Sequence, residues 1–157
     1  MLMIMRQFNF TRNKRLFRHG RTRKIKNNDH KTMKTKTLFS VIESPTHPFL
    51  TPLYNKLGID ELCFKHMRKL ISKIKKVQPN YIAVEFFYGY GNNYAGINIS
   101  NLDVMLYSLQ RYSPETKVIV FVDKSERQYV DKLNDILPLH TVMTLPVKET
   151  ELIIALK

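Results

Sequence analysis

Four polar side chains in this sequence lie at the ends of apolar, strand-like runs, where they could act together. Glu43 and Ser44 follow "TLFSVI", Glu85 lies within "YIAVEFF", and Asp123 follows "KVIVFV". Carboxylate oxygens are the ligands that hard divalent cations prefer. Glu85 is therefore a catalytic group, the remnant of one, or a polar residue at a strand end, and the surrounding elements must distinguish these interpretations.

The elements around these residues alternate between two kinds. Five segments rich in β-branched and aromatic residues are predicted strands: residues 37–42, 62–64, 81–87, 117–122 and 141–145. Between them apolar residues recur at helical spacing, as in Met67, Leu70, Ile71 and Ile74. Gly58 is a predicted helix stop, and Ser100 or Asn101 a predicted helix cap.

This alternation predicts an α/β domain over residues 37–157, with a five-stranded parallel sheet covered on both faces. Ligands of such sheets bind at the carboxyl ends of the strands. Glu43, Ser44, Glu85 and Asp123 are therefore expected at one edge of the sheet, with Leu145 and Pro146 beside them.

Over residues 36–157 the chain resembles a response-regulator receiver domain, a flavodoxin-like fold with strand order 2-1-3-4-5. "YIAVEFF" looks like the third strand with its acceptor carboxylate, "KVIVFVDKSE" like the fourth strand and its loop, and "TLPVKETEL" like the fifth strand and final helix. The resemblance implies a role in signal transduction. It also implies a cis peptide bond between Leu145 and Pro146.

Carried over residue by residue, the family's phosphorylation pocket is degenerate. The acidic pair falls at Glu43 and Ser44, and the phosphoacceptor aspartate falls at Glu85. The hydroxyl after the fourth strand falls at Val122, with Asp123 next, and the lysine falls at Leu145. Phosphoryl transfer needs a held cation and a positive group, so we expect a pseudo-receiver that is not an enzyme and has no cofactor or metal. Glu85 could imitate the charge of a phosphorylated aspartate.

The loop after the third predicted strand has the composition of a contact surface. "YGYGNNYAGINIS" combines glycines with rigid, amphipathic tyrosines and adaptable asparagines. It is either a compact surface loop or a site for a protein partner. The residues expected to contact that partner are Tyr88, Tyr90, Asn92, Asn93 and Tyr94.

The charge is concentrated in the first 36 residues, which hold 12 Lys and Arg against one acid, Asp29. Residues 37–157 hold 14 against 12. We expect this N-terminal segment to be disordered and to contact nucleic acid or another polyanion. A solvated tail, or a start codon placed too far upstream, would explain the same composition. The cations expected to bind phosphate are Arg12, Arg15, Arg18, Arg21, Arg23, Lys24 and Lys26.

The remaining features bound the compartment and the oligomeric state. A single cysteine, Cys63 in the apolar run "LCF", excludes an internal disulfide and predicts a buried, inert thiol. No apolar tract is long enough to span a membrane, so a cytoplasmic location is expected. A short last helix, from about Lys148, is expected to expose Leu152, Ile153 and Leu156 and to favour a homodimer or docking.

Two other hypotheses assign a different function to the same fold. One is a small-ligand module for flavin or a cobalamin-like cofactor, although "ESPTHPFLTP" lacks a phosphate cradle and His47 lacks the cobalamin motif. The other is a working phosphoacceptor that uses Glu85. The leading hypothesis is a regulatory or adaptor domain for protein–protein interaction.

Overall fold

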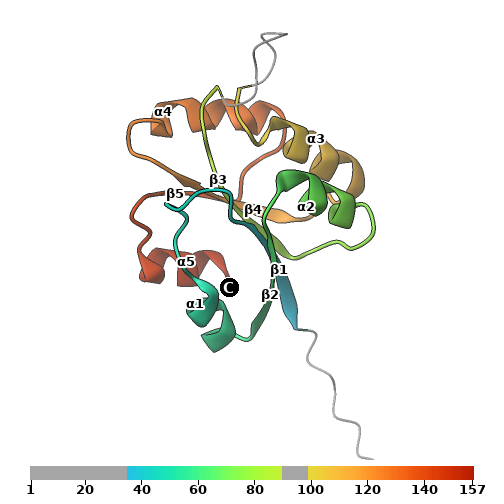
Figure 1. Cartoon of the computed structure of the whole chain (residues 1–157), viewed down its shortest axis with the longest axis vertical. Coiled ribbons are helices and arrows are strands. Elements are labelled where there is room, and N and C mark those ends of the chain that lie inside the picture. Colours follow the sequence, from blue (N-terminus) through green and yellow to red (C-terminus); the bar gives the residue numbers. More distant parts are fainter. Residues whose placement is uncertain (1–34, 90–98) are drawn as a thin grey trace, which may run out of the picture. The chain divides into compact units, whose positions relative to one another are not determined.

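The structure is a computed structural model, which describes residues 35–89 and 99–157. Five parallel strands form one sheet in the order β2-β1-β3-β4-β5 (Figure 1). The predicted sheet and strand order are confirmed. The strands are β1 (Lys36–Val41), β2 (Ile59–Phe64), β3 (Tyr81–Glu85), β4 (Lys117–Val122) and β5 (Thr141–Thr144).

Helices cover both faces of this sheet (Figure 1). One face carries α1 (Thr51–Lys56) and α5 (Glu149–Ala155). The other carries α2 (Met67–Ile74), α3 (Asp103–Tyr112) and α4 (Arg127–Val130), which continues as a short 3-10 helix, η1 (Asp131–Asp135). This layered arrangement is the one that alternating strands and helices predict.

The central strand β3 shows why these runs are almost continuously apolar. All five of its residues are buried. Ile82 and Val84 pack into the core under α2 and α3, whereas Tyr81 and Ala83 pack into the core under α1 and α5. Successive side chains of a strand point to opposite faces, so a strand covered on both sides must be apolar at nearly every position.

The edge strand β2 differs from its prediction. It starts at Ile59, earlier than the expected residue 62. Asp60 and Glu61 pair with β1, but their charges interrupt the apolar pattern from which the strand was predicted. Leu62 is 41% exposed and Cys63 is exposed. The prediction of a buried thiol is therefore wrong, because an edge strand is only partly covered by helices.

The end of the chain also differs from the prediction. Leu152 and Leu156 are buried, at 0% and 3% exposure, in the core with α1, and Ile153 is partly buried against it. The exposed apolar residue of α5 is Ile154, at 71%. The argument for a homodimer through Leu152, Ile153 and Leu156 is therefore wrong, since the chain covers these side chains itself.

Two local predictions are confirmed, and the predicted helix cap is displaced. Gly58 follows the last turn of α1 with a φ of 68°, in the left-handed region that favours glycine. The predicted cap at Ser100 or Asn101 falls just before the observed position: the N-cap residue of α3 is Leu102, without a side-chain cap, and the Ser100 hydroxyl accepts the Leu102 N–H at 3.0 Å in the turn before the helix. The Leu145–Pro146 peptide bond is cis. Within residues 35–89 and 99–157, none of the helices is long and apolar enough to cross a membrane.

Candidate functional site

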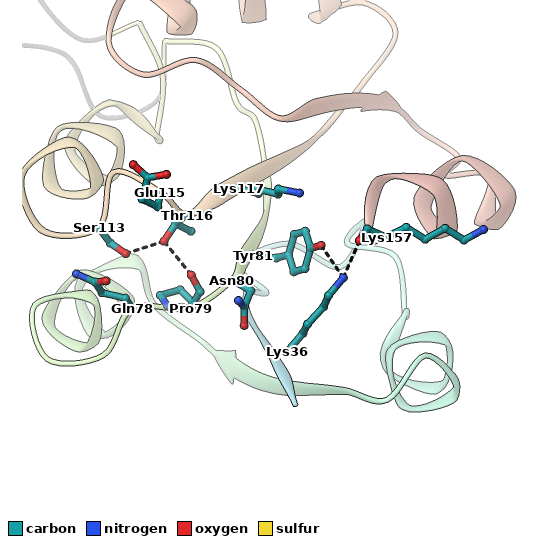
Figure 2. A pocket seen from close by; sticks show the side chains of 10 residues that line it. All are labelled: Lys36, Gln78, Pro79, Asn80, Tyr81, Ser113, Glu115, Thr116, Lys117 and Lys157. Atoms are coloured by element: carbon teal, nitrogen blue, oxygen red, sulfur yellow. Dashed lines mark hydrogen bonds between the residues drawn. The ribbon is translucent and has the colours of Figure 1, made fainter. Parts of the chain in front are cut away.

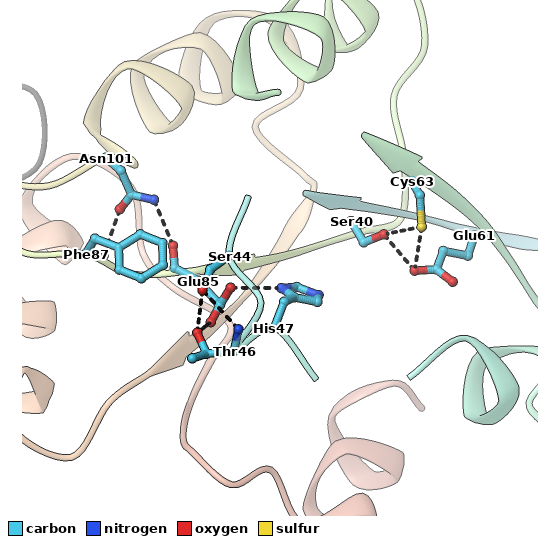
Figure 3. A network of polar contacts seen from close by, with 9 residues as sticks. All are labelled: Ser40, Ser44, Thr46, His47, Glu61, Cys63, Glu85, Phe87 and Asn101. Atoms are coloured by element: carbon cyan, nitrogen blue, oxygen red, sulfur yellow. Dashed lines mark hydrogen bonds and ion pairs between the residues drawn. The ribbon is translucent and has the colours of Figure 1, made fainter. Parts of the chain in front are cut away.

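Glu85 is the last residue of β3 and is only 5% exposed. The Thr46 hydroxyl donates a hydrogen bond of 2.8 Å to its Oε1, and His47 Nδ1 lies 3.4 Å from its Oε2 (Figure 3). Both partners belong to the loop between β1 and α1, which folds over the end of β3. The carboxylate is thus enclosed by its own chain.

His47 faces this carboxylate as a neutral imidazole. Its side chain is 3% exposed and its ring packs edge-on against Phe121. Burial lowers the pKa of His47 below its ordinary value of 6.5, and the nearby Glu85 and Glu61 carboxylates only partly oppose this effect. The contact between His47 and Glu85 is therefore not an ion pair at neutral pH.

Glu43 and Ser44, which follow β1, both accept hydrogen bonds from backbone N–H groups. The Ser44 hydroxyl accepts the backbone N–H of Thr46 at 3.1 Å and lies 2.5 Å from the Thr46 hydroxyl. Glu43 turns to α2, where its Oε1 accepts the N–H of Met67 at 2.9 Å. Each of the two side chains therefore has a hydrogen-bond partner of its own at this end of the sheet.

The loop after β3 is held to the strand by Asn101. Its side-chain NH₂ donates to the Glu85 carbonyl, and its Oδ1 accepts the Phe87 N–H, both at 2.9 Å (Figure 3). Tyr88 and Ser100 form an antiparallel bridge at the base of the loop. The described residues on the two sides of this loop are therefore fixed to each other and to the end of β3.

A hollow of about 340 Å³ lies at this edge, between β3, β4 and the loops that follow them. Three carboxylates line it, those of Glu85, Asp123 and Glu126, and no Lys or Arg is among its described lining residues. Its other lining residues are Thr46, Phe86, Phe87, Phe121, Ser125 and Leu145.

The remaining predicted pocket residues divide between this hollow and the core. Leu145 lines the hollow, with the cis Pro146 directly after it. Val122 is 1% exposed and belongs to the core under α2, α3 and α4, so it is not a pocket residue. Asp123 accepts hydrogen bonds from the Ser125 hydroxyl and N–H, which lower the pKa of its exposed carboxyl.

A second polar cluster, which the sequence did not suggest, joins β1 to β2. The Ser40 hydroxyl donates to Glu61 Oε1 at 2.6 Å and lies 3.0 Å from Cys63 Sγ (Figure 3). Partial burial raises the pKa of the Cys63 thiol, and burial raises that of the nearby Tyr54 phenol. The thiolate is disfavoured, so this cluster lacks an activated nucleophile.

The amino ends of the strands hold another hollow, of about 360 Å³, in which Lys36 and Thr116 make hydrogen bonds (Figure 2). The Lys36 ammonium donates to the carbonyl oxygens of Leu156 and Lys157, at 3.0 and 2.8 Å, and lies 5.5 Å from the centre of the Tyr81 ring. The Thr116 hydroxyl donates to the Pro79 carbonyl at 2.9 Å. These contacts tie β1, β3 and α5 together, and we assign them a structural role.

The predicted partner loop is only partly described. Tyr88 is 47% exposed and stacks on Tyr129, with ring centroids 3.9 Å apart and an angle of 16° between the planes. Tyr90, Asn92, Asn93 and Tyr94 lie outside the described residues. The predicted phosphate-binding cations also lie outside them: Arg12, Arg15, Arg18, Arg21, Arg23, Lys24 and Lys26.

Sequence reasoning missed Thr46, His47, Asn101 and Glu126. Asn101 was considered only as a helix cap, and His47 only for a cobalamin motif. Their roles depend on how two loops fold over the sheet edge. A loop lacks the periodicity that marks a strand or a helix. The sequence signal that could have indicated these residues is that their loops follow the ends of strands.

No model of a known protein family matches the chain, and no curated protein matches it. Solved structures do. A signal receiver domain of a Pseudomonas fluorescens HD domain-containing protein matches with a TM-score of 0.58 and 11% identity, over 78% of this chain and 92% of that one. A Thermotoga maritima response regulator matches with a TM-score of 0.58 and 15% identity, over 78% and 94%.

A third similar structure contains a phosphorylated residue and a metal ion. It is a Burkholderia pseudomallei response regulator with a phosphorylated aspartic acid and a calcium ion, with a TM-score of 0.57 and 14% identity, over 78% of this chain and 66% of that one. This chain has the receiver-like α/β fold. At these identities the similarity establishes the fold alone, and any chemistry must be inferred from the side chains of the site.

The described carboxylates at this edge are engaged by hydrogen bonds and do not form a site for a cation such as the calcium ion of the Burkholderia pseudomallei structure. Glu43 caps α2, Glu85 is bound by Thr46, and Glu126 Oε1 accepts the Tyr88 N–H at 3.3 Å. Among residues 35–89 and 99–157, no group of three or more His, Cys, Asp or Glu side chains is placed to hold a metal ion. The carboxylates therefore serve the local structure.

Proposed function

We propose that this protein is a receiver-like regulatory domain that acts without accepting a phosphoryl group. The observation that carries the proposal is the acidic hollow beside Glu85. Its three carboxylates would repel a phosphate dianion, and Leu145 stands where the family's lysine would neutralise the charge. Glu85 itself is buried, and its Oε1 already accepts a hydrogen bond from the Thr46 hydroxyl.

In this proposal the domain works by binding another protein, through the loop that follows β3. The stem of that loop is fixed by Asn101 and by the bridge between Tyr88 and Ser100. A fixed stem presents the loop's tyrosines and asparagines with little ordering cost at the base. The N-terminal segment adds a polyanion-binding element to this adaptor.

The acidic hollow also separates this function from the flavin alternative. A flavin mononucleotide carries a phosphate that parallel sheets bind with backbone N–H groups and hydroxyls at the strand ends. Here the same edge presents the carboxylates of Glu85, Asp123 and Glu126. Adaptor function is therefore the hypothesis that the site supports best.

A phosphate-mimic titration tests the proposal. Beryllofluoride with Mg²⁺ is added to the full-length protein, and thermal unfolding and tyrosine fluorescence are followed, with a phosphorylatable receiver domain in parallel. We expect a stabilising shift in the control domain and none in this protein, because a ligand that binds only the folded state must raise its stability. A saturable shift here that Glu85→Gln abolishes would show a working phosphoacceptor.

A further inference from the structure

The surface between α2 and α3 carries exposed aromatic and cationic side chains that the proposed function does not use. They surround a hollow of about 410 Å³, which we call the α2–α3 groove. Its lining residues are Lys75, Val104, Tyr107, Ser108, Arg111 and Tyr112. None of the six is acidic.

Four of these residues form one stripe along α3. Positions 104, 107, 108 and 111 have the spacing that places side chains on a single helix face. Val104 and Tyr107 are 56% and 54% exposed, whereas the opposite stripe of the helix is completely buried. The outward stripe is about 10 Å long at the rise of an α-helix. Exposed apolar and aromatic residues of this kind mark an interaction surface.

Two cations flank an aromatic ring at the end of the stripe. Lys75 Nζ lies 5.6 Å and Arg111 Cζ lies 5.2 Å from the centre of the Tyr112 ring, both within cation–π distance. The Gln78 side chain donates to the Tyr112 carbonyl at 2.9 Å and fixes the chain there. The charges are thus held beside the ring.

The α2 region, from which Lys75 enters the groove, is strongly basic. Residues 65–76 contain six Lys and Arg and no acid. Five of the six are exposed, since α2 buries Leu70 and Ile74 and turns its polar face outward. These five are Lys65, Arg68, Lys69, Lys75 and Lys76. A surface with this composition attracts polyanions.

We propose that the α2–α3 groove binds single-stranded nucleic acid. Bases of a single strand are free to stack on Tyr107, while its phosphates meet Lys75 and Arg111, which lie over the Tyr112 ring. A stacked strand advances about 3.4 Å per nucleotide, so the stripe spans about three nucleotides. Duplex bases are stacked inside the helix and cannot stack on Tyr107. An acidic peptide would pair with Lys75 and Arg111, but it would not use the exposed Tyr107 ring.

The experiment uses the full-length protein and a short fluorescein-labelled oligo-uridine, with anisotropy measured across a salt series. Lys75→Glu/Arg111→Glu is compared with the matched double variant Lys124→Glu/Lys132→Glu, which changes the net charge equally at two other exposed lysines, one of them over the Tyr129 ring. Tyr107→Ala removes an exposed ring at little cost to folding. A photoreactive thiouridine version of the same oligonucleotide then maps the contacted peptides.

We expect the groove double variant to lower the magnitude of the salt slope by about 2 and the matched variant to leave it unchanged. Tyr107→Ala should weaken binding by at least about fivefold at every salt concentration, because stacking is independent of counterion release. Crosslinks should appear in residues 104–112. Equal losses in the two double variants, crosslinks confined to residues 1–34, or no binding by the wild type would each overturn the proposal.

This test is separable from that of the proposed function. Beryllofluoride reports on the Glu85 hollow, whereas the oligonucleotide reports on α2 and α3. A phosphorylatable Glu85 would leave the groove result unchanged. If a duplex of the same length bound as tightly as the single strand, the surface would be a general phosphate-binding face and the stacking part of the proposal would fail.

Discussion

At the scale of single residues, burial has changed what the side chains at the sheet edge can do. Glu85 occupies a strand-end position that could serve catalysis, but its oxygens face Thr46 and His47 in the loop that encloses them. His47, which burial keeps neutral, cannot compensate the carboxylate's charge without taking up a proton. This pair therefore links the local structure to pH.

The first prediction concerns His47 and acid stability. Its pKa lies below 6.5 in the folded protein, so between these two values the unfolded chain binds a proton that the folded chain does not. The free energy of unfolding should consequently fall as the pH decreases below about 6.5, by at most about 1.4 kcal/mol per pH unit from this group. His47→Gln should lose this component, which urea unfolding between neutral and mildly acidic pH measures.

The matched control is His66→Gln, at an exposed histidine that precedes α2. It should follow the wild-type pH profile, because this change leaves His47 and its contact with Glu85 intact. Parallel profiles for the wild type and both variants would show that His47 takes no part in the pH dependence. A profile that is steeper in His47→Gln would reverse the assigned sign.

At the scale of elements, the regular parts of the fold were predictable and the loops were not. The continuous apolar run of β3 and the stripe of α3 each have one period, and both elements formed where that period indicated. The pattern of β2 is broken because an edge strand has one partner and mixed exposure. The strand ends located Glu85 and Asp123, whereas Thr46 and His47 reached the site through a loop conformation that has no sequence period.

The second prediction concerns the start of α3. The buried Asp103 carboxylate accepts the N–H groups of Ile99 and Ser100 and the Ser100 hydroxyl, while that hydroxyl accepts the Leu102 N–H. These reciprocal hydrogen bonds close the turn that leads into α3. Asp103→Ala leaves several buried donors unpaired and should lower the free energy of unfolding by about 2–4 kcal/mol.

Asp103→Asn is the control for this change, because it keeps one acceptor oxygen in nearly the same volume. Its loss in urea unfolding should lie between those of the wild type and Asp103→Ala. If both substitutions cost less than about 0.5 kcal/mol, the carboxylate would not be supporting the helix start. The same hydrogen bonds hold Ile99 and Ser100, so they also support the bridge between Ser100 and Tyr88.

At the scale of the whole molecule, the distribution of charge separates two sources of polyanion binding. Residues 1–36 hold 12 of the 26 Lys and Arg, and the α2 region, residues 65–76, holds six more with no acid. Most of the acids lie elsewhere in residues 37–157, which makes that part nearly neutral overall. The small net charge of residues 37–157 therefore does not reveal the concentration of Lys and Arg in the α2 region.

The last prediction separates these two sources with a variant that lacks residues 1–32 and keeps the compact unit of residues 33–157. Residues 1–32 contain ten of the Lys and Arg, so their removal should lower the affinity for single-stranded RNA and flatten the plot of log K against log salt. The weaker binding that remains should depend on Tyr107 and Arg111, because those residues belong to the folded domain. Equal affinity and slope with and without residues 1–32 would show that the N-terminal segment makes no phosphate contacts and would leave the α2–α3 groove as the only one of the two proposed sites that binds.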